Sequence, residues 1–183
     1  QPFSCQYSHI KTEELRQCLA GKKILFLGDS TNRGIFYYLI ERINGSILNW
    51  DKTHDYKSYS DINEGRSHMA FAYYPQFWLP SNKRPVFDQS LYQLLLRSGP
   101  IRNDSSTVLV VGGVQWLSTQ HLHMLLSVLK REKLQGIRVF VKSLGSGFHT
   151  PSQPKSSYQD HERLLAHTKS ITDYAQQHGL EVI

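Results

Sequence analysis

The chain has 183 residues, which is enough for one domain with a substantial buried core, and its composition is ordinary for a globular protein. It holds no apolar run long enough for a transmembrane helix, so we expect no membrane-spanning segment. The net charge is +6, but the positive residues are scattered and form no basic stripe interleaved with aromatic residues, which argues against nucleic acid as a partner. Attraction to acidic glycans or surfaces fits this charge equally well.

The first half of the chain begins with a lead-in and then a strand followed by a helix. Residues 23–27 (KILFL) form a short apolar run that predicts a buried strand. Apolar residues then recur at helical spacing from Ile35 to Ile43, with Ser30 or Thr31 available as the cap and Asn44-Gly45 as the stop. Residues 46–64 are polar and predict an irregular stretch, residues 68–74 predict a strand, and residues 75–85 a proline-rich loop.

The second half repeats the alternation of helix and strand. We expect helices at residues 88–97, from the Ser118 cap towards Gly136, and at 158–178; strands at 107–111, 137–141 and 180–183; and a loop at 143–157. This order predicts an α/β fold with a mainly parallel sheet covered by helices on both faces. The site of such a sheet lies beyond the carboxyl ends of its strands, which selects the loops 28–33, 112–116 and 143–150.

The cysteines and the sequons bear on the compartment. Cys5 and Cys18 are the only cysteines, too few to make a zinc site alone, and a disulfide between them is plausible in an oxidising compartment. Sequons stand at Asn44 and Asn103. We therefore expect a protein of the secretory pathway (ER or Golgi lumen) or the extracellular space, and we expect neither a metal nor a cofactor, because no pair of histidines has the spacing of a metal site.

The tetrapeptide Gly28-Asp29-Ser30-Thr31 stands between the first strand and its helix. A serine at this turn points into the crevice, and the backbone N–H groups at the helix start can stabilise an oxyanion. The same serine could instead be an ordinary helix cap, and the spacing alone leaves both interpretations open.

The segment from Lys22 to Gly34, KKILFLGDSTNRG, with Cys18 and Gly21-Lys22 in its approach, resembles the nucleophile block of the SGNH (GDSL-type) hydrolases and, among these, the PC-esterase group. That resemblance implies a three-layer, flavodoxin-like sandwich. It also implies that Ser30 is the nucleophile, that Gly28, Asp29 and Arg33 support its loop, and that Ser30, Gly113 and Gln115 form the oxyanion hole.

Two features depart from the pattern of that family. Gln115 stands where the family has asparagine; it can still donate an N–H, or Gln115-Trp116 could be a capping and packing loop. The family's Asp-x-x-His is missing after the last strand, and the upstream match Asp51-Lys52-Thr53-His54 is interpreted as chance. His149 is the best internal base, although a solvated loop histidine is the plainer interpretation.

The roles of the neighbouring residues follow from these assignments. We expect Asp29 to accept backbone N–H bonds and Arg33 to brace the loop by pairing with an acid, or to bind substrate. The aromatic residues Tyr73, Tyr74, Phe77 and Trp78 either stack on a sugar ring or pack in the core.

The functional expectation is an esterase or acyltransferase acting on acyl esters of a glycan or glycoprotein, impaired in this chain because the base is missing. The alternative is a non-catalytic SGNH-like binding or scaffold module. We expect a lead-in at residues 1–20 and the SGNH-like domain at 21–183, and because the chain stops inside its last strand we expect that domain to lack a C-terminal piece.

Overall fold

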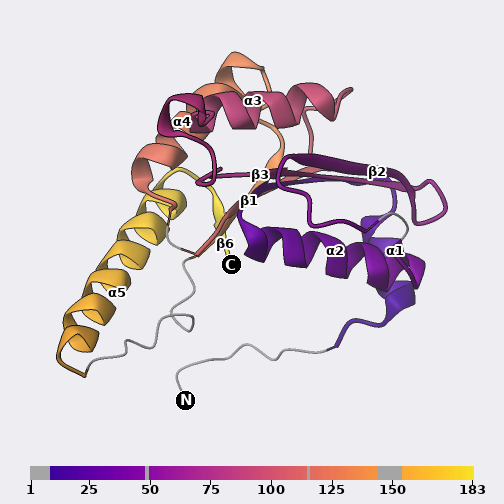
Figure 1. The fold of residues 1–183 in the computed structure, drawn as a ribbon. Helices are drawn as coiled ribbons and strands as arrows, with labels where there is room; N and C mark the ends of the chain where they lie inside the picture. The colour runs from indigo at the N-terminus through magenta and orange to yellow at the C-terminus, as the bar shows by residue number, and fades with distance from the viewer. Residues whose placement is uncertain (1–8, 48–49, 115, 144–153) are drawn as a thin grey trace.

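The computed structural model describes residues 9–47, 50–114, 116–143 and 154–183, with side chains given for all of these except 154–161. One six-stranded sheet, with the strand order β2-β3-β1-β4-β5-β6, forms its centre, and Figure 1 shows this sheet between its helices. The strands are β1 Lys23–Gly28, β2 Tyr56–Ile62, β3 Ser67–Tyr73, β4 Thr107–Gly112, β5 Arg138–Lys142 and β6 Glu181–Val182. The helices are α1 Thr12–Leu19, α2 Ser30–Asn44, the short 3-10 helix η1 Ser81–Lys83, α3 Phe87–Arg97, α4 Thr119–Arg131 and α5 Pro154–Gln177.

Strand β1 lies in the middle of the sheet and is parallel to both of its neighbours. Phe26 faces Phe71 of β3 on one side and Val110 of β4 on the other. All residues of β1 after Lys23 are buried, which explains why this strand reads as a continuous apolar run rather than an alternating one. Among the strands that the structure describes, β2 alone runs antiparallel, at the edge beside β3.

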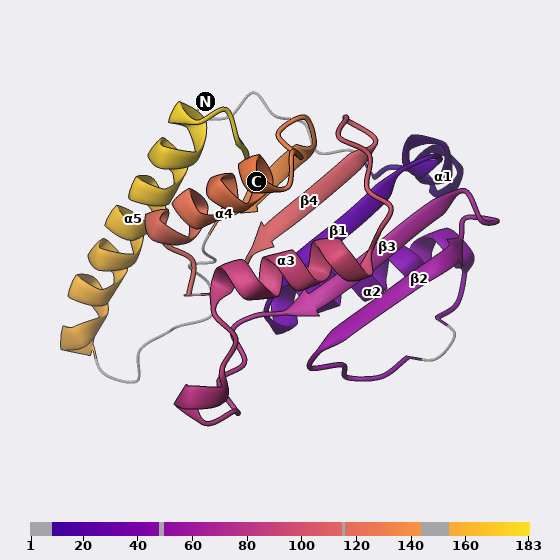
Figure 2. The same ribbon diagram turned by 90° about the horizontal axis from the view of Figure 1, so that it is seen from above.

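Helices cover both faces of the sheet, so the predicted α/β sandwich is confirmed. Helices α1 and α2 lie on one face, and α3, α4 and α5 lie on the other (Figures 1 and 2). On the α2 face Phe36 is fully buried, with its ring 5.9 Å from Phe26 and 5.7 Å from Phe71. On the opposite face, leucines of α3 and α4 pack with Ile171 and Ala175 of α5. Within the described residues, no helix is both long and apolar enough to cross a membrane.

The helix boundaries follow capping chemistry. Helix α2 ends at Asn44, and Gly45 adopts the left-handed conformation that glycine tolerates, with φ of 77°. Ser118 caps α4 by accepting the N–H of His121. Both of these signals were predicted from the sequence.

Two elements differ from the sequence-based prediction. Strand β2 occupies part of the stretch expected to be irregular; it is an edge strand whose residues are mostly half-buried or exposed, so it lacks a strong apolar pattern. Helix α1 lies in the stretch treated as a lead-in. It buries only Leu15 and is tied to α2 by Arg16, whose Nε donates to the Ile43 carbonyl at 2.7 Å.

Candidate active site

The nucleophile turn lies where the chain changes from one face of the sheet to the other. After β1 the chain passes through α2 on one face and then through β2 to reach β3, whereas after β4 it passes through α4 on the opposite face to reach β5. The loops after β1 and β4 therefore leave the sheet in opposite directions, and Gly28 and Gly112 are paired side by side at that edge. This is the position at which open α/β sheets bind their ligands.

Gly28 is required by close packing at this turn. A Cβ on Gly28 would lie 2.1 Å from the carbonyl oxygen of Gly112 and 2.6 Å from Nδ2 of Asn32. Asn32 is fully buried in the first turn of α2, where its Nδ2 donates to the Leu27 carbonyl at 3.2 Å. The glycine thus lets the start of α2 sit directly against the ends of the two central strands.

Asp29, not Ser30 or Thr31, caps helix α2, which corrects the expectation from the sequence. Its Oδ1 accepts hydrogen bonds from the backbone N–H of Thr31 at 2.9 Å and from the Thr31 hydroxyl at 2.8 Å. Ser30 is the first residue of the helix and is exposed, and no described residue hydrogen-bonds to its hydroxyl. The serine is therefore not used as a cap.

Asp29 also joins the nucleophile turn to the loop after β4. Its Oδ2 accepts the backbone N–H of Val114 at 2.7 Å. A Cβ on the neighbouring Gly113 would lie 2.3 Å from that same Oδ2 and 2.1 Å from Nε1 of Trp116, so only glycine fits there. Gly113 thus lies beside the nucleophile turn, while Gln115, the expected oxyanion residue, lies outside the described residues.

Lys142 is a charged residue of this site that the sequence analysis missed. It ends β5, and its Nζ donates to the Thr31 hydroxyl at 2.7 Å. Burial lowers the pKa of Lys142, and the nearby Asp29 carboxylate acts in the opposite direction. The signal available in the sequence was the position of this lysine, which follows the strand residues RVFV and therefore lies at the carboxyl edge of the sheet.

Arg33 braces a neighbouring loop, but not by the acid pairing expected for it. Its Nη1 donates to the Thr53 carbonyl at 2.8 Å, and its guanidinium lies 5.5 Å from the centre of the Tyr73 ring. In the described part of the chain, no carboxylate forms an ion pair with it. Arg33 therefore fixes the segment before β2 against the start of α2.

The upstream Asp-x-x-His lies on that braced segment without forming an Asp–His pair. The ring of His54 is exposed and lies 5.4 Å from Tyr73 and 4.9 Å from Trp78. The Asp51 carboxylate bonds to Lys57 at 3.1 Å and to the Tyr37 hydroxyl at 3.2 Å, and the hydrogen bond from Lys57 is the main reason that the pKa of Asp51 is lowered. The proposed base His149 lies outside the described residues.

The structure places His121, in the first turn of α4, half-buried among aromatic rings. Its ring is 5.4 Å from Trp116 and 5.1 Å from Phe87. Its Nδ1 is 2.9 Å from the Ser118 hydroxyl and its Nε2 is 3.4 Å from the Tyr74 hydroxyl. Burial lowers the pKa of His121, which favours the neutral ring.

The four aromatic residues at the end of β3 and just after it divide between the two roles left open by the sequence. Tyr74 is buried in the core beside Phe87. Phe77 and Trp78 are exposed by 62% and 48%, which leaves their rings available to a ligand. Tyr73 is half-buried, with its ring 4.8 Å from that of Trp78.

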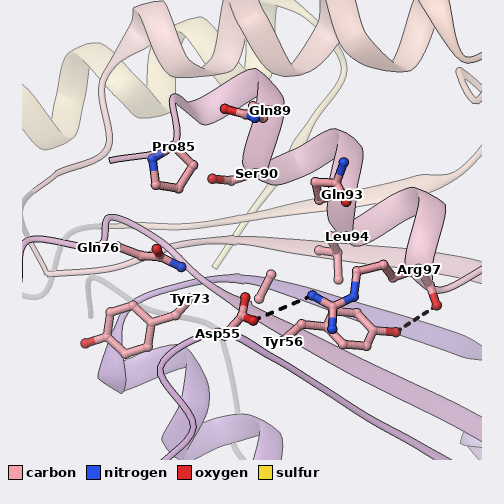
Figure 3. Close-up of a pocket in the computed structure, with 11 residues that line it drawn as sticks. Asp55, Tyr56, Tyr73, Gln76, Pro85, Gln89, Ser90, Gln93, Leu94 and Arg97 are labelled. Carbon is pink, nitrogen blue, oxygen red and sulfur yellow. Dashed lines mark hydrogen bonds and ion pairs between the residues drawn. The ribbon is translucent and has the colours of Figure 1, made fainter. Parts of the chain in front are cut away.

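A polar pocket of about 170 Å³ opens between α3 and the strands β2 and β3 (Figure 3). It adjoins the nucleophile turn, because its lining residue Tyr73 is paired with Gly28 and the next N–H, that of Tyr74, donates to the Gly28 carbonyl at 2.9 Å. Figure 3 shows Arg97 extending towards Asp55, to which it pairs at 3.7 Å. We call this hollow the glutamine pocket, after Gln76, Gln89 and Gln93 in its wall.

Three neutral polar side chains of the glutamine pocket have no hydrogen-bond partner among the described residues. The side chain of Ser90 is 7% exposed, and its hydroxyl has no hydrogen-bond partner among the described residues. The amides of Gln89 and Gln93 likewise have none there, while Gln76 makes one long bond of 3.4 Å to the His54 carbonyl. These neutral donors and acceptors suit a ligand that is rich in hydroxyl groups.

The remaining predicted sites are at the surface. Asn44 and Asn103 are both exposed, and each uses its side-chain oxygen to accept a backbone N–H, from Asn63 at 3.0 Å and from Gly136 at 2.6 Å. Cys18 is exposed on α1, and Cys5 lies outside the described residues, so their pairing stays a prediction. The described residues contain no group of three or more side chains able to hold a metal ion.

Comparison with known families matches residues 1–145 to the domain described as NXPE family member 4-like, C-terminal domain. Among curated proteins, the chain is similar to N-acetylneuraminate (7)9-O-acetyltransferase of Danio rerio, with 26% identity over 121 residues. That alignment covers 66% of this chain but only 14% of the relative.

Together these matches support an SGNH-like domain related to acyltransferases and esterases. The residues around Ser30 also predict a likeness, among animal PC-esterase proteins, to cadherin-like and PC-esterase domain-containing protein 1. The comparisons support the broader superfamily and not that particular protein.

Proposed function

Because the chain belongs to the family of the NXPE family member 4-like, C-terminal domain, we propose that it is an acyl-ester domain in which Ser30 is the nucleophile. The observation that carries this proposal is that Asp29, and not Ser30, makes the structural hydrogen bonds of the turn. Asp29 caps α2 and holds the loop after β4, so Ser30 is left exposed at the switch point, and no described residue hydrogen-bonds to its hydroxyl. An ordinary capping serine would instead be bonded to its own helix, as Ser118 is.

The proposed chemistry is acyl transfer in two steps. The Ser30 oxygen attacks the carbonyl carbon of an ester, its proton passes to a base, and the alcohol leaves as an acyl-serine forms. Water or a sugar hydroxyl then attacks the acyl-serine and releases Ser30. The oxyanion of each tetrahedral intermediate is stabilised by N–H donors, for which we propose the backbone of Ser30 and Gly113 and the side chain of Gln115.

We propose His149 as the base within this chain, since the segment that contains it follows the carboxyl end of β5. Loss of turnover in His149→Ala, with a circular dichroism spectrum that shows the variant to be folded, would support that role. Turnover that is unchanged in this variant would require a base from elsewhere. Lys142 is proposed as a positioning residue that fixes the Thr31 hydroxyl beside Asp29.

We propose a glycan or glycoprotein as the acyl acceptor or substrate. The support is the glutamine pocket next to the turn, the exposed rings of Phe77 and Trp78, and the sialate acetyltransferase among the relatives. That relative also supports a protein of the secretory pathway, as do the exposed sequon residues Asn44 and Asn103. No nucleic acid is proposed as a partner.

The experiment is an acetyl-release assay on the purified chain with O-acetylated sugars and a simple aryl acetate. Ser30→Ala should lower the rate on the order of a hundredfold or more, because the nucleophile is lost. Ser118→Ala is the matched control, since it also removes a hydroxyl at the start of a helix but should keep the rate. Equal rates in the wild type and Ser30→Ala would refute the proposal.

The second function is the non-catalytic binding module, and one observation favours it. Within the described residues, no imidazole or carboxylate reaches the Ser30 hydroxyl, so no activating base is in place there. A module of this kind would bind an acetylated glycan with the same affinity in the wild type and in Ser30→Ala, and it would release no acetate.

A further inference from the structure

A second polar hollow lies at the opposite, amino-terminal edge of the sheet. Lys23 begins β1 and is paired with His68 of β3 on one side and with Thr107 of β4 on the other. These three residues line a hollow of about 200 Å³, which we call the basic pocket. It is separated from the nucleophile turn by the whole length of β1.

Four cationic side chains line the basic pocket: Lys22, Lys23, Arg66 and Arg102. They come from three separate parts of the chain, which is why the sequence shows only one pair of adjacent lysines. No aspartate or glutamate is among the lining residues. The positive charge of the chain is therefore concentrated here more than the scattered sequence pattern suggests.

Three of these cations, Lys22, Lys23 and Arg102, are fixed by neutral groups, which orient them without cancelling their charge. The Nζ of Lys23 donates to the carbonyl oxygens of Ser98 and Pro100. Lys22 donates to the Ser105 carbonyl and Arg102 to the Gly21 carbonyl, each at 3.1 Å. A carbonyl dipole accepts the hydrogen bond but leaves the net charge in place.

The nearby carboxylates are exposed and only partly offset this charge. Glu64 pairs with Arg66 at 3.3 Å, and its side chain is 77% exposed. Asp104 lies close enough for Arg102 and Lys22 to contribute to the lowering of its pKa, but its main partner is Ser106. Pairs of this kind at the surface contribute little binding energy, and an anion can compete with them.

The positive charges of Lys23, Arg102 and protonated His68 repel one another in the basic pocket. Burial lowers the pKa of Lys23, and the charge of Arg102 lowers it further. Burial likewise lowers the pKa of His68, with Lys23 as the second cause. The Nε2 atom of His68 is enclosed and has no hydrogen-bond partner in the described part of the chain. An anion placed between these groups would relieve the repulsion and could also accept a hydrogen bond from the ring.

We propose that the basic pocket binds a phosphate or sulfate group. A tetrahedral oxyanion offers several acceptor oxygens to converging donors, which is the arrangement that lysine and arginine side chains create here. Two kinds of molecule carry such a group: a free inorganic phosphate or sulfate ion, and a phosphate or sulfate ester on a glycan. The site is independent of Ser30 and does not rest on the proposed acyl transfer.

The test is calorimetric titration of the purified chain with inorganic phosphate, inorganic sulfate and a sulfated disaccharide, at fixed ionic strength. The double variant Lys22→Gln/Arg102→Gln should weaken binding about tenfold or more, because two donors to the anion are lost. The matched control is Lys52→Gln/Lys83→Gln, which removes the same charge from exposed residues away from the pocket and should bind as the wild type does. Circular dichroism checks that both variants are folded.

The titrations distinguish binding in the basic pocket from binding elsewhere, and an ester from a free ion as the ligand. Binding that is lost in the pocket variant and kept in the control supports the site, and it should be unchanged in Ser30→Ala. Tighter binding of the disaccharide than of free sulfate identifies the ester as the source, and equal binding identifies the ion. Absence of binding by all three probes, or equal loss in the pocket variant and the control, would overturn the proposal.

Discussion

The two edges of the parallel sheet hold their polar groups in different ways. At the carboxyl edge, charged groups bond into one connected network, in which Lys142 donates to Thr31, Thr31 donates to Asp29, and Asp29 also accepts the N–H of Val114. At the amino edge, the lysines and Arg102 donate to backbone carbonyls and remain unneutralised. The first arrangement fixes the geometry of a reactive turn, and the second creates a positive field for a ligand.

The largest expected effect is at the carboxyl edge, where the packing is closest. Gly28→Ala should lower the free energy of unfolding by about 3 kcal/mol, because its Cβ would overlap the Gly112 carbonyl and Asn32. Gly34→Ala is the control: Gly34 lies in α2 with no heavy atom within 4 Å of an added Cβ, so this substitution should be neutral or stabilising. Urea unfolding measures both, and equal stability of the two variants would contradict the close packing described here.

The network at the turn gives the next effect. Asp29→Ala should cost about 2 kcal/mol, because it removes both the cap of α2 and the bond to the loop after β4. Ser118→Ala removes a helix cap that lacks such a link between loops, and it should cost about 1 kcal/mol. If the two variants were equally destabilised in urea, the bond to Val114 would contribute nothing to the fold.

The pH dependence of stability tests the buried ring near the same edge. Burial lowers the pKa of His121 below its ordinary value of 6.5. As the pH falls through about 6.5, the unfolded chain takes up a proton that the folded chain resists, so the free energy of unfolding should decrease.

His121→Phe should therefore reduce the slope of stability against pH on the acidic side of 6.5, while His68 continues to contribute to it. His123→Phe, on the same helix but exposed, is the control for the change of ring. A slope that is identical in His121→Phe and the wild type would show that the ring titrates as it does in the unfolded chain.

The smallest effect is expected at the amino edge. Arg102→Gln removes one exposed bond to the Gly21 carbonyl and also one repelling charge, so stability should stay within about 0.5 kcal/mol of the wild type. A loss as large as that of Asp29→Ala would mean that the basic pocket holds the fold together. The contrast between the two edges would then disappear.

The sequence predicted those parts of the fold that depend on local patterns. The run before Gly28, the helical spacing up to Ile43, the stop at Gly45 and the N-cap at Ser118 all act over a few residues, and the structure has them where they were expected. Strand β2 was missed because an edge strand with exposed polar residues carries a weak pattern and is defined by its partner β3.

The polar sites depend on contacts between distant parts of the chain. The Ser30 turn could be located because it follows a strand, but its cap was assigned to the wrong residue, since serine, threonine and aspartate all serve as caps. Lys142 lies 111 positions from Thr31, and Arg102 lies 81 from Gly21, so only the register of the sheet brings them together. The basic pocket could not be predicted for the same reason.

The central claim is that Ser30 is the reactive serine at the carboxyl edge. The most direct measurement is labelling of the native chain with a fluorophosphonate probe, followed by mass spectrometry of its peptides. We expect the label on Ser30; it should be lost in Ser30→Ala and persist in Ser118→Ala. Labelling that persists undiminished in Ser30→Ala would contradict the claim.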